Sequence, residues 1–235
     1  MHGREQDMDH GTRDELLSRL AEAVRSVTIA HPTRVAIDGV PGAGKTTLAD
    51  ELAVVLRAQG REVIRATIED FLNPRSVRHP WSDSAEGWYN HNTDLGALHR
   101  VLLDPLGPGG DRRIQRAVYD KATDIALSPP VTTAAIDAVL LFDGVFLLRN
   151  ELFDRWDLRI FVSATFGKAL ERSRIRDQTP LMSADEVEHR YRRRYMPSQR
   201  FYFETIHPAE HADILVNNDE PQRPAWEIRA TGPGR

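Results

Sequence analysis

The residues with the clearest chemical signal are eight consecutive positions, Gly39-Val40-Pro41-Gly42-Ala43-Gly44-Lys45-Thr46. They fit the pattern G-x-x-x-x-G-K-[ST], the P-loop, in which backbone N–H groups converge on the phosphates of a nucleotide. Glycines suit this turn because a Cβ atom would block the close approach of a phosphate. Lys45 is expected to reach the β- and γ-phosphates, and the Thr46 hydroxyl to bind Mg²⁺. The predicted nucleotide-binding residues here are Gly39, Pro41, Gly42, Ala43, Gly44, Lys45, Thr46 and Thr47.

Carboxylates follow two further stretches that have the composition of strands. Glu69 and Asp70 come after residues 62–67, and Asp143 comes directly after residues 138–142. In an open parallel sheet, the carboxyl ends of the strands form the edge where ligands bind. Glu69 and Asp70 are therefore either two solvated loop acids, or one of them is a catalytic or Mg²⁺-linked acid. Asp143 matches the acid that holds the Mg²⁺ shell of P-loop enzymes, directly or through water.

A basic region follows the strand expected at residues 157–162. Arg172, Arg174 and Arg176 are two positions apart, so on a helix Arg172 and Arg176 share a face while Arg174 points away. Such arginines can form a solvated, salt-bridged surface, or they can clamp the charge that develops on a transferred phosphoryl group. A capping box at residues 183–186 predicts a further helix in this region.

The other expected elements follow from hydrophobic spacing and capping signals. An apolar stretch at residues 34–38 predicts a strand before the P-loop, and the leucine spacing in residues 47–59 predicts a helix after it. A capping box at Thr12 and Glu15 predicts a leading helix. Residues 73–93 are expected to be irregular. Their aromatic side chains either cover a flat substrate such as a base or form a satellite core beneath the loop.

Length and composition favour a single α/β domain. The chain has 235 residues and a net charge of −4, so it has no global attraction to nucleic acid or to an anionic membrane. It contains no cysteine and no apolar run of transmembrane length, and we expect a soluble cytoplasmic protein. We expect residues 1–11 to be disordered, residues 12–218 to form the domain, and residues 219–235 to be a tail of low structure.

In this order, the motifs resemble the uridine kinase-like group of P-loop kinases, relatives of phosphoribulokinase and bacterial pantothenate kinase. The resemblance covers about residues 33–218. It is carried by the P-loop and by Ile68-Glu69-Asp70-Phe71, Glu86-Gly87-Trp88-Tyr89, Pro105-Leu106-Gly107-Pro108-Gly109-Gly110-Asp111, Tyr119-Asp120, Phe142-Asp143-Gly144, Arg176-Asp177 and Pro197-Ser198-Gln199-Arg200. The resemblance implies an α/β P-loop NTPase fold, a three-layer sandwich with a mainly parallel five-stranded sheet, flanking helices and an arginine-rich lid.

The resemblance also implies roles for individual residues. Counted back from Phe71, the proton-accepting Asp of the family's Asp-x-Phe motif corresponds to Glu69, with Asp70 where a small residue is usual; either could be the base. The family's His after the Tyr-Asp pair, which helps to hold a pyrimidine nucleoside, has no counterpart in Lys121-Ala122-Thr123. The implied catalytic residues are Lys45, Glu69, Asp70, Arg172 and Arg176; Arg174 binds nucleotide; Thr46 and Asp143 bind metal; Phe71, Arg75, Trp88, Tyr89, Tyr119 and Arg190 bind the acceptor.

These observations predict an enzyme that uses ATP and Mg²⁺ to phosphorylate a hydroxyl of a nucleoside, such as uridine, or of a similar ribosyl alcohol. Two alternatives stay open: a kinase for another alcohol such as pantothenate, and a nucleotide-binding regulatory module without transfer activity. The expected partner is a small-molecule alcohol, with no nucleic acid or membrane. The sequence leaves open the acceptor, the choice between Glu69 and Asp70, and whether the protein forms a homo-oligomer.

Overall fold

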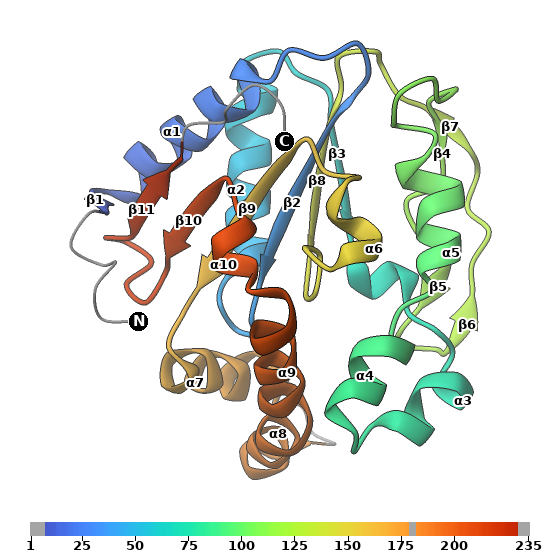
Figure 1. Cartoon of the computed structure of the whole chain (residues 1–235), viewed down its shortest axis with the longest axis vertical. Coiled ribbons are helices and arrows are strands. Elements are labelled where there is room, and N and C mark those ends of the chain that lie inside the picture. Colours follow the sequence, from blue (N-terminus) through green and yellow to red (C-terminus); the bar gives the residue numbers. More distant parts are fainter. Residues whose placement is uncertain (1–7, 179–181, 230–235) are drawn as a thin grey trace.

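The structure, a computed structural model, describes residues 8–178 and 182–229. It has a central sheet flanked by helices (Figure 1). The strands are β1 (Asp9–His10), β2 (Thr33–Gly39), β3 (Val63–Thr67), β4 (Arg113–Ile114), β5 (Tyr119–Asp120), β6 (Ile125–Ala126), β7 (Thr132–Thr133), β8 (Val139–Gly144), β9 (Leu158–Ser163), β10 (Ile214–Asn217) and β11 (Ala225–Ile228). The α-helices are α1 (Arg13–Ser26), α2 (Lys45–Ala58), α3 (Arg75–Arg78), α4 (Ala85–His91), α5 (Leu95–Leu98), α6 (Asn150–Phe153), α7 (Phe166–Asp177), α8 (Ala184–Arg190), α9 (Met196–Ile206) and α10 (Pro208–His211). Short 3₁₀ segments η2 (Ile68–Phe71) and η3 (His79–Trp81) and π-helical turns η4 (His99–Leu103) and η5 (Tyr191–Tyr195) connect several of them.

The central sheet contains seven strands in the order β1-β11-β10-β9-β2-β8-β3. The five strands from β10 to β3 run parallel, so the predicted five-stranded parallel core is confirmed. Their carboxyl ends therefore meet at one edge, where β2 leads into the P-loop and β8 ends in Asp143 and Gly144. β2 and β8 are buried along their whole length, as expected for parallel strands with helices on both faces.

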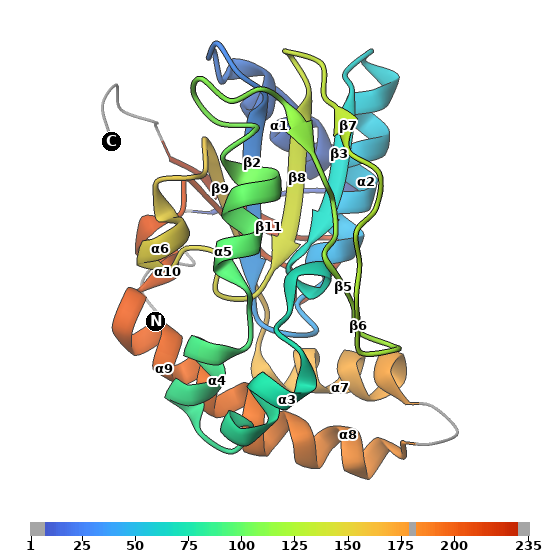
Figure 2. The same ribbon diagram turned by 90° about the vertical axis from the view of Figure 1, so that its right-hand side faces the viewer.

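Each face of the sheet packs against its own helices. On one face, α1 and α2 contribute Leu16 and Leu48 to an apolar core with Ile37 of β2. On the other face, α5 and α6 belong to a second apolar core that contains Phe142 and Trp156. Figures 1 and 2 show these layers from two directions, with α1 and α2 on the side of the sheet away from α5 and α6. The predicted three-layer sandwich is therefore confirmed.

Both capping boxes expected from the sequence are present. The Thr12 hydroxyl accepts a hydrogen bond from the Glu15 N–H, and the Glu15 carboxylate accepts one from the Thr12 N–H, where α1 begins. Ser183 and Glu186 make the same exchange where α8 begins. These local signals set the starts of α1 and α8.

Helices gather at the carboxyl edge of the parallel strands. In Figures 1 and 2, α7, α8 and α9 lie below this edge, with α3 and α4 beside them. The expectation of an irregular segment at residues 73–93 is wrong, because α3, η3 and α4 occupy most of it. α3 and α4 are only four and seven residues long, too short to show a helical period in the sequence.

The C-terminal region adds a strand to the sheet. β11 pairs antiparallel with β10, and its Trp226 is buried in the core that α1 and α2 form. The expectation of low structure at residues 219–235 is therefore wrong for Ala225–Ile228. Residues 230–235 of that predicted tail lie outside the described residues.

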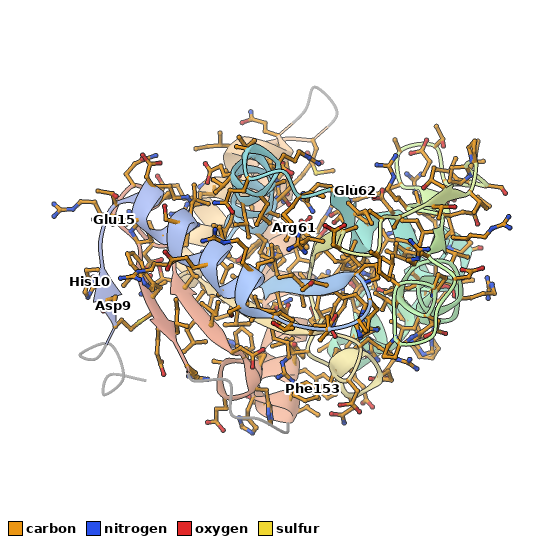
Figure 3. All side chains as sticks on the ribbon, turned by 90° about the horizontal axis from the view of Figure 1, so that it is seen from above. Asp9, His10, Glu15, Arg61, Glu62 and Phe153 are labelled. Carbon is orange, nitrogen blue, oxygen red and sulfur yellow. The ribbon has the colours of Figure 1, made fainter. Side chains whose placement is uncertain are left out.

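The N-terminal region adds the outermost strand. In β1, Asp9 pairs with Trp226 and His10 with Ala225, so the expected disorder at residues 1–11 is wrong for this part; residues 1–7 lie outside the described residues. Seen from above, Asp9 and His10 lie beside Glu15 at one end of the molecule (Figure 3). Within the part of the chain that the structure describes, none of the helices combines the length and apolar composition needed to cross a bilayer.

Candidate active site

The P-loop connects β2 to α2 and turns sharply at its glycines. Gly42 and Gly44 have φ angles of +85° and +92°, in the left-handed region that favours glycine. A Cβ atom at Gly42 would lie 2.2 Å from the Ala169 carbonyl oxygen of α7, so the turn also packs too closely for a side chain. α2 begins at Lys45, directly after Gly44, which turns its first N–H groups and the positive end of its dipole toward the loop.

Side chains from distant segments hold the backbone of this loop. Asn218 Nδ2 donates a hydrogen bond to the Ala43 carbonyl oxygen at 2.6 Å. The Tyr191 hydroxyl donates one to the Pro41 carbonyl oxygen at 3.1 Å. The carbonyl oxygens of Pro41 and Ala43 thus accept hydrogen bonds from side chains outside the loop.

Thr47, which was also predicted to bind nucleotide, lies in the first turn of α2 and is exposed.

Lys45 lies in the first turn of α2 and is buried. Its Nζ donates a hydrogen bond to the Val40 carbonyl oxygen at 2.9 Å. Burial lowers the pKa of Lys45 to about 8, and the charges of Asp38 and Asp143 oppose this change. The ammonium group therefore lies in the field of carboxylates from β2 and β8, at the carboxyl edge of the sheet.

Thr46 and Asp143 are joined by a hydrogen bond. Thr46 Oγ1 donates to Asp143 Oδ2 at 2.6 Å, across 97 positions of sequence. Arg65 of β3 donates from Nη2 to the other carboxylate oxygen of Asp143 at 2.8 Å and fixes its orientation. The structure thus brings together the two residues predicted to bind metal.

This pair suits Mg²⁺, which prefers hard oxygen ligands such as hydroxyls and carboxylates. Among the described residues, no group of three or more His, Cys, Asp or Glu side chains could hold a metal ion. Mg²⁺ sites in kinases commonly combine one or two protein oxygens with phosphate oxygens of the substrate. Thr46 and Asp143 would supply the protein ligands of such a site.

Glu69 and Asp70 lie on the 3₁₀ segment η2, directly after β3. Glu69 is exposed, and its carboxylate accepts a hydrogen bond from Lys121 Nζ at 2.9 Å. Its charge also opposes the lowering of the Lys45 pKa that burial causes. Asp70 is half-buried, and burial raises its pKa, with smaller contributions in the same direction from the charges of Glu69 and Asp143. The two adjacent acids therefore occupy different environments near the same edge.

α7 carries the three arginines predicted for the lid, and two of them contact neighbouring elements. Arg172 Nη2 donates hydrogen bonds to the carbonyl oxygens of Asn218 and Asp219 at 2.9 and 2.7 Å. Arg174 forms an ion pair with Glu188 of α8 at 3.2 Å. Arg172 thus joins α7 to the segment after β10, and Arg174 joins α7 to α8.

Arg176, at the end of α7, is the third. Its guanidinium pairs with Asp177 at 2.6 Å. Its charge lowers the pKa of Lys45, and the charge of Glu69 in turn raises the pKa of Arg176. The function of Arg176 as a lid arginine stays a prediction.

The four aromatic side chains predicted to bind the acceptor are all buried: Phe71, Trp88, Tyr89 and Tyr119. The sequence left two interpretations of the aromatic side chains in residues 73–93, a cover for the substrate or a core beneath the loop. For Trp88 and Tyr89 the second applies, because both belong to the apolar core on the α5 face. The Arg194 guanidinium lies 4.6 Å from the Trp88 ring centroid.

The two arginines predicted to bind the acceptor are exposed. Arg75 Nη2 donates a hydrogen bond to the Lys121 carbonyl oxygen at 3.0 Å, next to the Glu69–Lys121 ion pair. Arg190 lies at the end of α8 and borders a cavity of about 580 Å³ whose lining is entirely charged side chains and a histidine. The structure thus separates the acceptor candidates into a buried aromatic group and two exposed cations.

A sequence model of the cytidylate kinase-like family matches residues 34–220. The chain belongs to the cytidylate kinase-like family. A search of curated proteins finds no match.

Solved structures similar to this cytidylate kinase-like protein include kinases with different named acceptors. A protein described as a possible uridine kinase, from Bacillus stearothermophilus, is 22% identical with a TM-score of 0.67, covering 86% of this chain and 97% of its own. One provisionally described as a fructose transport system kinase, from Silicibacter sp. TM1040, is 22% identical with a TM-score of 0.67, covering 80% and 94%. D-glycerate 3-kinase from Cryptococcus neoformans is 17% identical with a TM-score of 0.61, covering 86% and 94%. These similarities confirm the P-loop kinase fold.

Sequence reasoning missed three charged residues that support the site of this cytidylate kinase-like protein. Arg65 fixes Asp143, Lys121 pairs with Glu69, and Asp38 acts on Lys45. Arg65 and Asp38 each interrupt an apolar strand, and that interruption was an available signal. Lys121 had none, because its contact depends on the β5–β6 hairpin folding against η2, where the Val118 N–H donates to the Asp70 carbonyl oxygen.

Proposed function

We propose that this protein is a Mg²⁺-dependent kinase that transfers the γ-phosphate of ATP to a hydroxyl of a small molecule. The observation that carries the proposal is the junction at the carboxyl edge of the sheet, where Thr46 of the P-loop is hydrogen-bonded to the strand-end Asp143 beside buried Lys45. A cation, a hydroxyl and a carboxylate in this arrangement are the parts that bind a triphosphate with its metal ion. Membership of the cytidylate kinase-like family supports the same chemistry.

The triphosphate would be held mainly by the P-loop. The amides at the start of α2 would bind phosphate oxygens, and Lys45 would exchange its bond to the Val40 carbonyl for the β- and γ-phosphates. Thr46 and Asp143 would hold Mg²⁺, whose charge neutralises that of the phosphates. Arg65 would keep the Asp143 carboxylate in place when Thr46 turns from it toward the ion.

Transfer to the acceptor would depend on positioning and charge more than on covalent chemistry of the protein. Arg176 is the proposed clamp for the charge that develops on the transferred group, because it lies on α7, which packs against the P-loop at Gly42. Glu69 or Asp70 would accept the proton of the attacking hydroxyl. The contacts of Arg172 and Arg174 favour a role in holding α7 against its neighbours.

We infer a nucleoside or a similar ribosyl alcohol as the first candidate acceptor. The order of the motifs and the likeness to a protein described as a possible uridine kinase support this choice. Another alcohol is the alternative. The order of the motifs leaves pantothenate open, and structures with this fold carry names that refer to fructose or to glycerate. The exposed Arg75 and Arg190 are the proposed first contacts for the acceptor.

The test is ADP release with a panel of nucleosides, pantothenate, sugars and glycerate, each with ATP and Mg²⁺. We expect turnover that requires one class of alcohol. Lys45→Ala should lower kcat by roughly 10²–10⁴-fold, because it removes a charge directed at the β- and γ-phosphates. ATP binding without alcohol-dependent turnover would favour a regulatory module, and a Lys45→Ala variant with wild-type kcat would overturn the proposed site.

A further inference from the structure

A carboxylate is buried directly behind the P-loop. Asp38 is the last residue of β2 before Gly39, and its exposure is 0%. Its Oδ1 accepts a hydrogen bond from the Gly39 N–H at 2.7 Å. Its Oδ2 accepts one from the Tyr202 hydroxyl at 2.5 Å and one from the Leu148 N–H at 3.3 Å. All of these donors lie in different parts of the sequence from one another.

Tyr202 completes this buried group from α9. Its hydroxyl oxygen accepts a hydrogen bond from the Leu148 N–H at 3.0 Å while it donates to Asp38. Its ring lies edge-on to Phe146, with centroids 5.2 Å apart, so the phenol has a fixed position in the core. Burial raises the pKa of Tyr202 well above its ordinary value, which keeps the hydroxyl protonated as a donor.

The buried charge is costly for stability. Burial raises the pKa of Asp38, and the Tyr202 hydroxyl, the Lys45 charge and the two backbone N–H groups offset part of that effect. Replacing such a buried polar group with apolar side chains is often neutral or stabilising in other proteins. The carboxylate is therefore poorly explained as a device that stabilises the core.

Its position explains it better. Gly39 has a φ of +149°, and a Cβ atom there would lie 2.1 Å from the Val162 carbonyl oxygen of β9, so the first residue of the loop is confined between Asp38 and β9. Leu148 lies in the segment that follows β8, the strand that carries Asp143. One carboxylate thus connects the start of the P-loop to the segment after the strand of the proposed metal ligand.

α9 links the same group to the helices at the carboxyl edge. α8, η5 and α9 follow one another without a break from Ala184 to Ile206. Two tyrosines of this helical run contact the P-loop region: Tyr191 through the Pro41 carbonyl, and Tyr202 through Asp38. The π-helical turn η5 begins at Tyr191, and such turns often occur at functional sites.

We propose that Asp38 and Tyr202 are a positioning pair that fixes the start of the P-loop against β8 and α9, and so sets the geometry of the triphosphate cradle. The inference rests on the proposed function insofar as the P-loop binds ATP. Neither side chain needs to touch the nucleotide. They act through the backbone of Gly39, because a small displacement of a binding group can cost about 100-fold in rate.

The test compares Tyr202→Phe with Ser198→Ala. Both variants remove one buried hydroxyl from α9. Within the described part of the chain, Ser198 donates only to carbonyl oxygens of its own helical run, those of Arg194 and Tyr195. We would measure three quantities for each variant. They are the melting temperature without nucleotide, the calorimetric affinity for a non-hydrolysable ATP analogue in the presence of Mg²⁺, and kcat. We expect both to lose stability, and only Tyr202→Phe to lose analogue affinity or kcat, by about tenfold or more.

Asp38→Asn provides the second arm. It keeps the size of the side chain while removing its charge, and we expect the same loss of analogue affinity or kcat. If the residues act as a pair, Asp38→Asn combined with Tyr202→Phe should fall no further than the more affected single variant. Equal affinity and kcat in Tyr202→Phe, Ser198→Ala and wild type would overturn the proposal. Wild-type protein that binds no nucleotide would overturn both proposals, whereas binding without any accepted alcohol contradicts only the kinase reaction.

Discussion

The two acids of η2 illustrate how neighbouring residues come to differ in chemistry. Glu69 is exposed, pairs with Lys121 and exerts its charge on both Lys45 and Arg176. Asp70 is half-buried, and burial raises its pKa, with smaller contributions from the charges of Glu69 and Asp143. A catalytic base has to reach the acceptor hydroxyl, and an exposed side chain that follows β3 at the carboxyl edge of the sheet has that access. These surroundings favour Glu69 as the base.

Glu69→Gln and Asp70→Asn test this assignment. Each keeps the size of the side chain and removes its basicity. We expect Glu69→Gln to lower kcat by about 10²–10⁴-fold with ATP affinity retained, and Asp70→Asn to keep most of the activity. Steady-state kinetics with the accepted alcohol gives kcat, and calorimetry gives the affinity for ATP. The reverse pattern would assign the base to Asp70, and two active variants would mean that neither acid is the base.

At the residue level, the sequence is informative where one continuous segment carries the function. Lys45 and Thr46 follow from the P-loop pattern, because the loop, the helix start and both side chains lie within eight positions. Arg65 and Asp143 could not be paired in this way. Their contact requires β3 to lie beside β8 with Arg65 opposite Leu141, and strand order in a parallel sheet depends on long crossover connections.

At the level of elements, α7 is held to the segment after β10 at its start and in its middle, in part by an arginine that the sequence suggested for catalysis. Arg172 binds the carbonyl oxygens of Asn218 and Asp219, and the Asp219 carboxylate accepts a hydrogen bond from the Thr165 N–H at 2.7 Å, just before α7 begins. The helical spacing of the arginines is evident in the sequence. The face of α7 that packs against a neighbour is not, because it depends on where the segment after β10 lies in the fold.

Arg176→Ala, with Arg192→Ala as its control, tests the function of α7. Removing the Arg176 charge should lower kcat by roughly 10²–10³-fold, as expected for the loss of one group that stabilises transition-state charge. Arg192 is exposed and pairs with Glu188 one turn away at 2.8 Å, so its loss should change little. Arg172→Ala should mainly lower the melting temperature. Equal kcat in the Arg176 and Arg192 variants would show that the charge of Arg176 plays no part in transfer.

At the level of the whole molecule, the parallel core was predictable and its extension was not. Apolar strands that alternate with helices indicate a parallel sheet, and helices on both faces make those strands easy to recognise. β11 has only four residues and follows Pro221 and Pro224, and β1 has two residues. Strands this short carry too little alternation to be recognised. β11 pairs with the edge that β10 would otherwise leave open, and β1 pairs with β11 in turn.

Trp226→Ala tests how much this extension contributes to the fold. Trp226 is 4% exposed, lies opposite Val216 of β10 and Asp9 of β1, and packs in the core formed by α1 and α2. Removing so large a buried side chain should lower the free energy of unfolding by about 3–5 kcal/mol. Ile228→Ala on the same strand is the control, because Ile228 is 43% exposed and should cost much less. Urea unfolding measures both. At urea concentrations well below the unfolding transition, nucleotide affinity should be unchanged in both variants. The residue of this region that contacts the P-loop is Asn218, which follows β10 and does not belong to β11. Equal losses of stability in the two variants would mean that β11 lies on the sheet without supporting the core.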